Sequence, residues 1–123
     1  MNRIVRAFTA AGAIGHRRLV KYTANDGEVA LATASTDIIA GVTDYPNGAS
    51  NGQRIDVVLD GPADIEAGGV MTPGAAITAD GTGRAVAAAP GAGVNAFVAG
   101  RTLVNTAAGD IAKAIINPTR IQG

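Results

Sequence analysis

Residues 53–62 decide the fold and have the sequence Gln-Arg-Ile-Asp-Val-Val-Leu-Asp-Gly-Pro. Polar and apolar side chains alternate through the first part, Gln53–Leu59, which is typical of a strand with one face in a core. Asp60-Gly61-Pro62 follows, and these residue types favour a turn, so we predict that the strand ends there. A short strand followed by a turn is the pattern that the rest of the chain repeats.

Turn signals of the same kind recur at close spacing along the chain. Each contains Gly, Pro, Asn or Asp, which bend the backbone through a positive φ, a fixed φ or a local hydrogen bond. Between them lie short β-type runs, spaced by roughly 8–12 residues, which favours a small all-β barrel or sandwich. The predicted runs are residues 18–23, 28–32, 37–43, 53–59, 75–79, 84–88, 95–99, 101–105 and 110–116.

Two segments leave a helix open as an alternative. Residues 2–14 are rich in Ala but interrupted by Gly, and residues 106–116 could form about three helical turns. Ile111 and Ile115 suit a final strand equally well, and we prefer the strand for this segment. A turn is expected after it, at Asn117-Pro118.

One six-residue stretch occurs in two similar versions. Residues 38–43 (Ile-Ile-Ala-Gly-Val-Thr) are similar to residues 97–102 (Phe-Val-Ala-Gly-Arg-Thr), which hints at two equivalent strands that each bend at a glycine. Glycine inside a strand commonly marks a bulge or a close backbone approach. The glycines to which we assign structural or turn roles are Gly41, Gly61, Gly69, Gly74, Gly83, Gly100 and Gly109.

The composition limits both the core and the chemistry. The chain has 123 residues, enough for one domain, and it contains no Cys, which excludes disulfides and thiolate metal sites. The hydrophobic fraction is 47%, but 26 of these residues are Ala, so little apolar area is buried per residue. We therefore expect the protein to gain stability by assembling with other chains.

Positive charge is concentrated near the start of the chain. The formal net charge is zero, yet no acidic residue precedes Asp26. This predicts an extended basic arm over residues 1–20 and a β-rich domain over residues 21–123. Such an arm could contact nucleic acid, an anionic protein surface or the acidic body of a neighbouring copy. The candidate partner-binding residues are Arg3, Arg6, Arg17, Arg18 and Lys21.

Neither export nor membrane insertion is predicted. Gly12 and Gly15 dilute the short apolar stretch near the start of the chain, and basic residues follow at once. No apolar run approaches the length of about 18 residues that a membrane span needs.

The sequence offers no convincing catalytic, metal or cofactor site. His16 is the single histidine, and the neighbouring Arg17 and Arg18 disfavour its protonation, while a flexible arm cannot hold a catalytic geometry. Residues 91–96 match the pattern G-x-G-x-x-A, but a dinucleotide site also needs a strand before it and a helix after it.

Four acidic residues cluster in the sequence at Asp56, Asp60, Asp64 and Glu66. In an extended segment Asp64 and Glu66 share a face, as in a hydrolytic pair or a calcium site. Alternating acids on a strand are more often its solvated face, and the EF-hand spacing is absent. We therefore predict no enzyme activity, no metal and no cofactor.

An ordered set of small motifs extends from about residue 26 to residue 118. They are Gly41-Val42-Thr43, Gly52, Ile55-Asp56-Val57-Val58, Gly61, Ala67-Gly68-Gly69, Thr72–Asp80, Gly83–Ala87, Ala99-Gly100, Ala108-Gly109-Asp110 and Asn117-Pro118. Their order and spacing resemble those of one known family, the capsid cement or head decoration proteins of tailed bacteriophages. The similarity leaves residues 1–20 unmatched.

The resemblance implies a structural virion protein with a small β-tulip-like fold and no catalytic residues. Members of this family sit on the outer surface of the expanded capsid after assembly in the host cytoplasm, commonly as homotrimers at three-fold or quasi-three-fold positions. They bind neighbouring subunits of the major capsid protein and stabilise the head against the pressure of packaged DNA.

Two alternatives to a cement protein remain. One is a phage accessory protein that binds nucleic acid non-specifically through the basic arm, which the acidic, ring-poor body makes less favourable. The other is a carbohydrate-binding module, which the shortage of aromatic residues disfavours.

Overall fold

The computed structural model describes residues 3–122, and every regular element in that range is a β-strand. The all-β fold predicted from the spacing of the turns is therefore confirmed. Residues 3–122 contain no helix capable of crossing a membrane. The strands are β1 (Ile4–Ala10), β2 (Leu19–Tyr22), β3 (Glu28–Leu31), β4 (Ile39–Thr43), β5 (Arg54–Glu66), β6 (Ala76–Ala79), β7 (Ala85–Ala87), β8 (Asn95–Thr102) and β9 (Ile111–Gln122).

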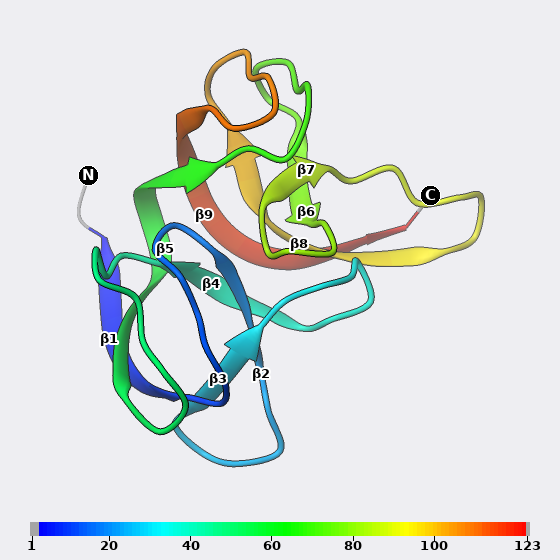
Figure 1. The fold of residues 1–123 in the computed structure, drawn as a ribbon. Helices are drawn as coiled ribbons and strands as arrows, with labels where there is room; N and C mark the ends of the chain where they lie inside the picture. The colour runs from blue at the N-terminus through cyan, green and yellow to red at the C-terminus, as the bar shows by residue number, and fades with distance from the viewer. Residues whose placement is uncertain (1–2, 123) are drawn as a thin grey trace.

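The strands form two small barrels that share β5 (Figure 1). Barrel 1 consists of β1, β3, β2, β4 and the first half of β5, and it closes because β1 pairs with both β3 and β5. Barrel 2 consists of the second half of β5 with β9, β8, β6 and β7. Its closing contact is a parallel bridge between Ala67, just after β5, and Ala85 in β7.

The two barrels are copies of one unit, as their strand registers show. The isolated bridge Ile14↔Ala49 in barrel 1 has its counterpart in Met71↔Thr106 in barrel 2, with both residues 57 positions further along the chain. The ladder that begins at Thr9↔Arg54 between β1 and β5 likewise corresponds to the ladder that begins at Glu66↔Ile111 between β5 and β9. The second half of β5 therefore plays in barrel 2 the part that β1 plays in barrel 1.

The buried cores follow the same repeat. Each residue of the barrel 1 core has a counterpart in the barrel 2 cluster, for example Phe8 and Ile65, or Ile14 and Met71. The barrel 2 cluster also takes in residues of barrel 1 that lie between the barrels: Leu19, Ala32, Ile39, Val42 and Val58. The two barrels are thus joined by a continuous apolar contact.

Gly41 and Gly100 occupy equivalent places beside β-bulges, as the similarity of residues 38–43 and 97–102 predicts. The register shifts next to each of them, in the β2–β4 and the β8–β9 ladders. A Cβ atom at Gly41 would collide with the backbone carbonyl of Val58, and one at Gly100 with that of Ile115. The strands can approach this closely only because both residues lack a side chain.

The other glycines to which the sequence assigns a structural role differ in backbone conformation. Gly61, Gly74, Gly83 and Gly109 have positive φ angles, which favour glycine. Gly69 has no such angle, and a Cβ there would meet Val86 at an ordinary contact distance of 3.9 Å.

Two predicted turns are wrong, because the strands continue through them. β5 runs through Asp60-Gly61-Pro62 and bends at Gly61, where φ is +99°. β9 runs through Asn117-Pro118 to Gln122. In each case the segment beyond the turn signal finds a partner strand, and this long-range pairing overrides the local turn preference.

The extended arm predicted over residues 1–20 is also wrong for the described part of that segment. Residues 4–10 form β1, which pairs with β3 and β5, and the expected boundary after residue 20 falls inside β2. Phe8 and Ala10 of β1 lie in the barrel 1 core. Burial of their apolar surface therefore holds this segment in the barrel.

Substituting the two bulge glycines tests the close approach of the strands. Gly41→Ala and Gly100→Ala should each lower the free energy of unfolding by about 3 kcal/mol or more, or prevent folding, because backbone must move to admit the methyl group. Gly81→Ala is the matched control, since its added Cβ meets nothing within 4 Å. Denaturant unfolding measures the difference, and equal stability of all three variants would contradict the register described here.

Candidate interaction surface

The basic residues of the N-terminal segment are largely paired with acidic residues of the same chain. Arg3 contacts Asp44 at 2.6 Å, and Lys21 contacts Asp37 at 3.5 Å. Arg6 instead lies over the ring of Phe8, with its guanidinium carbon 5.4 Å from the ring centroid. The positive charge that the sequence concentrates at one end is therefore offset locally by the folded body.

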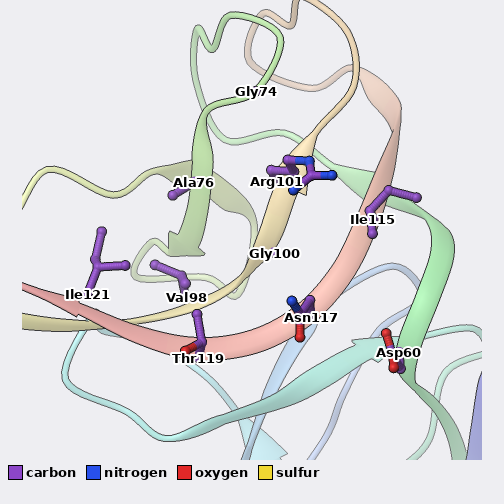
Figure 2. Close-up of a pocket in the computed structure, with 10 residues that line it drawn as sticks. All are labelled: Asp60, Gly74, Ala76, Val98, Gly100, Arg101, Ile115, Asn117, Thr119 and Ile121. Carbon is purple, nitrogen blue, oxygen red and sulfur yellow. The ribbon is translucent and has the colours of Figure 1, made fainter.

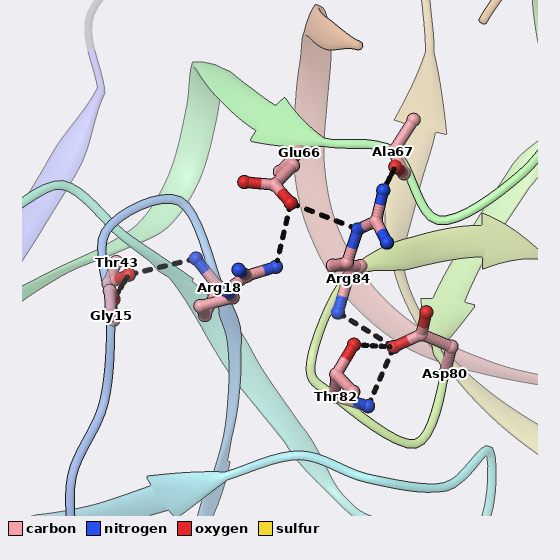
Figure 3. A network of polar contacts seen from close by, with 8 residues as sticks. All are labelled: Gly15, Arg18, Thr43, Glu66, Ala67, Asp80, Thr82 and Arg84. Atoms are coloured by element: carbon pink, nitrogen blue, oxygen red, sulfur yellow. Dashed lines mark hydrogen bonds and ion pairs between the residues drawn. The ribbon is translucent and has the colours of Figure 1, made fainter. Parts of the chain in front are cut away.

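Arg18 takes part in an ionic cluster where the two barrels meet (Figure 3). Its guanidinium contacts Glu66 at 3.1 Å, and Arg84 contacts the same carboxylate oxygen at 2.9 Å. Arg84 also donates a hydrogen bond to the carbonyl of Ala67. Since Arg18 belongs to barrel 1 and Arg84 to barrel 2, Glu66 links them at the end of the shared strand.

Arg17 and His16 lie with Arg18 in the loop that connects β1 to β2. Arg17 adopts a positive φ of 59° at the position that corresponds to Gly74 in barrel 2. His16 Nδ1 accepts a hydrogen bond of 2.9 Å from the backbone N–H of Tyr45. Burial and the charge of Arg17 lower the pKa of His16, with Asp44 and Asp64 opposing them. His16 thus serves as a neutral structural acceptor.

The acidic cluster predicted on β5 is a surface of ion pairs. Asp56 contacts Arg54 at 2.8 Å, and Asp64 contacts Lys113 at 2.8 Å. The hydrogen bond from Lys113 holds the pKa of Asp64 below its usual range. Within residues 3–122 no group of three His, Asp or Glu side chains is placed to hold a metal ion. The glycine pattern at residues 91–96 leads into β8 rather than into a helix.

Two open grooves lie along the second half of β9. The first, of about 500 Å³, lies between β6 and the β8–β9 pair, and Asp60, Arg101 and Asn117 give it polar groups (Figure 2). The second, of about 450 Å³, lies towards barrel 1 and is mainly apolar. Its lining residues include Tyr22, Ile38, Leu59, Phe97, Pro118 and Arg120.

The segment that separates the grooves is the β9 tail, which we define as Pro118–Gln122. It pairs with Asn95–Val98 of β8, and Thr119 lines both grooves. The sequence alone reveals neither this segment nor the two grooves, because Asn117-Pro118 predicts the end of the last strand. The signal that could have found it is the alternation of the β-branched residues Thr119 and Ile121 with the polar residues Arg120 and Gln122.

Exposed apolar residues lie near the second groove, at the loops of barrel 2 and on β1. Tyr22 is 49% exposed and Ile38 is 57% exposed beside the second groove, while Val70, in the loop after β5, is 79% exposed. Apolar grooves flanked by exposed strands suit recognition of another protein surface more than turnover of a small substrate.

Comparison with known proteins shows a likeness to a solved structure over the whole chain. No protein-family model and no curated protein sequence matches the chain. Its fold is similar to the crystal structure of the head fiber gp8.5 N base in bacteriophage phi29, with a TM-score of 0.67 and 17% sequence identity. The match covers 99% of this chain and 100% of that chain, so the likeness extends over the complete fold.

The environment of His16 predicts a pH dependence of stability. Because its pKa is lowered from 6.5 in the folded state, the unfolded chain takes up a proton first as the pH falls below about 6.5. The stability that the neutral imidazole provides is then lost progressively towards the folded pKa. His16→Asn, which keeps an acceptor for Tyr45 but does not titrate, should flatten the loss of unfolding free energy between about pH 7 and 5. The same slope in both proteins, measured by denaturant unfolding, would contradict this role.

Proposed function

We propose that this chain is a non-enzymatic structural protein of a phage head, which binds the outer surface of the expanded shell and links neighbouring subunits of the major capsid protein. The observation that carries the proposal is the likeness to a head fiber base over the full length of both chains. The order of the sequence motifs, which resembles that of head decoration proteins, supports the same conclusion independently of the fold.

The internal architecture suits a small binding module. The shared strand β5, the Glu66 ion cluster and the apolar contact between the barrels hold the two barrels in one rigid unit. A pre-organised module loses little conformational entropy when it docks, and contacts repeated over many copies add to the stability of the shell. We expect a homotrimer at three-fold or quasi-three-fold positions, as in the family that the sequence resembles.

The ion pairs of the basic residues bear on how the chain attaches to the head. Arg3, Arg18 and Lys21 already have acidic partners within the chain, and surface pairs of this kind contribute little net energy. We therefore assign attachment chiefly to the apolar grooves and exposed strands rather than to an extended basic arm. The same pairing weakens the alternative of nucleic-acid binding, which needs those charges free.

Binding to shells is the first test of the proposal. The purified chain should saturate expanded heads that lack it, in a fixed ratio to the major capsid protein, and should raise their resistance to heat. Light scattering of the free protein gives its oligomeric state, and co-sedimentation with heads gives the ratio. A stably folded protein that does not bind to heads at any concentration tested would overturn the proposal.

A gel shift separates this function from the nucleic-acid alternative. We expect no salt-sensitive shift of double-stranded DNA, even at low ionic strength where electrostatic binding is strongest. A shift that disappears with added salt, together with no binding to heads, would favour the alternative.

A further inference from the structure

The outer edge of the β9 tail presents unpaired backbone groups. Phe97 of β8 lies opposite Arg120 of β9. The N–H of Phe97 donates to the carbonyl of Ser35, and its carbonyl accepts from Thr78 Oγ1, both at 2.8 Å, so these groups point away from β9. Opposite residues of such an antiparallel pair both point outwards. The N–H and C=O of Arg120 therefore point away from β8.

Among the residues that the structure describes, no strand covers this edge. β5 pairs with β9 from Ile111 to Ile116 and stops there. Alternation along the strand then places the carbonyl of Pro118 and the N–H of Gln122 on the same free edge as the backbone groups of Arg120. This edge strand has hydrogen-bonding capacity for another chain.

The internal repeat shows what fits such an edge. The β9 tail is the counterpart in barrel 2 of the second half of β5, which continues beyond barrel 1 in the same way. There the corresponding edge is covered by an antiparallel strand, in the ladder from Gly61↔Ile116 to Glu66↔Ile111. In the covering strand, Ala112 and Ala114 alternate with the larger residues Ile111, Lys113 and Ile115. The chain thus contains an example of the strand that the β9 tail lacks.

The second groove lies directly beside the free edge. Pro118 and Arg120 form one wall, and Tyr22, Ile38 and Leu59 provide apolar surface. A strand added to the edge would place alternate side chains into this groove while its backbone bonds to Arg120. The combination of a free edge with an adjoining apolar groove is the arrangement used in β-augmentation.

We propose that the β9 tail binds an extended strand of the partner protein by β-augmentation, antiparallel to β9, with an acidic side chain opposite Arg120 and apolar side chains in the second groove. This rests on the proposed function, since the partner strand belongs to the head shell. Charge selects this occupant over a second copy of the chain, because pairing two β9 tails about their centres would set Arg120 against Arg120. Pro118, which lacks an N–H, further limits indiscriminate pairing.

Two substitutions at one position separate the backbone contribution from the charge. Arg120→Pro removes the free N–H and the charge, but it leaves Thr119 and Ile121 to bond with β8. It should weaken binding to expanded heads by about tenfold or more. Arg120→Gln removes only the charge and should have a smaller effect. Arg54→Gln, on the first half of β5 and outside both grooves, is the control that should bind as the unmodified protein does.

Hydrogen exchange on the unmodified protein gives a second readout that does not depend on a variant folding. The amides of Arg120 and Gln122 should exchange quickly in the free protein and slowly on heads. Normal binding by Arg120→Pro, or unchanged exchange at these amides in head-bound protein, would overturn the edge proposal while the proposed function stands. Failure of the unmodified protein to bind heads would overturn both.

Discussion

The continuity of β5 is the constraint on which the rest of the structure depends. Its first half closes barrel 1 against β1, and its second half begins barrel 2 against β9. The bend at Gly61, with its positive φ, lets one strand serve both barrels without a connecting loop. Because the barrels share a strand, their relative placement is fixed by backbone hydrogen bonds, and the ion cluster at Glu66 and the apolar contact around Val58 reinforce it.

The two copies of the unit differ in how they fill their interiors. Where barrel 1 has Val29, Ile55 and Val57, barrel 2 has alanine at all three corresponding positions. Smaller side chains bury less apolar surface, so barrel 2 contributes less to its own stability. It compensates by packing against Leu19, Ile39 and Val42 of barrel 1, which join its core cluster. The alanine-rich composition noted in the sequence is therefore concentrated in the half of the molecule that depends most on its neighbour.

Local sequence patterns predict most of the strands, but not β1, and most of the turns. They do not predict which strands pair. The alternation at residues 53–59 and the similarity between residues 38–43 and 97–102 are local, and the structure agrees with both. The errors come from long-range pairing. The turn residues after Leu59 and after Ile116 lie within strands because each continuation finds a partner. The basic segment is a barrel strand because Phe8 is buried, and Arg3 meets an acid 41 positions away in the sequence. The grooves depend on the same pairings, so the sequence alone could not locate them.

The repeat also connects the fold to the proposed function. β5 extends beyond barrel 1, and its second half is paired with β9. β9 extends beyond barrel 2 in the same way, but its tail pairs with β8 alone and has a free edge beside an apolar groove. A molecule built in this way has one rigid body and one open position for a further strand. A cryo-electron microscopy map of expanded heads saturated with the chain tests this account most directly. The account predicts the two-barrel domain on the outer surface, with a strand of the shell running antiparallel to Pro118–Gln122. A map without the domain on the shell, or with that edge facing solvent, would contradict it.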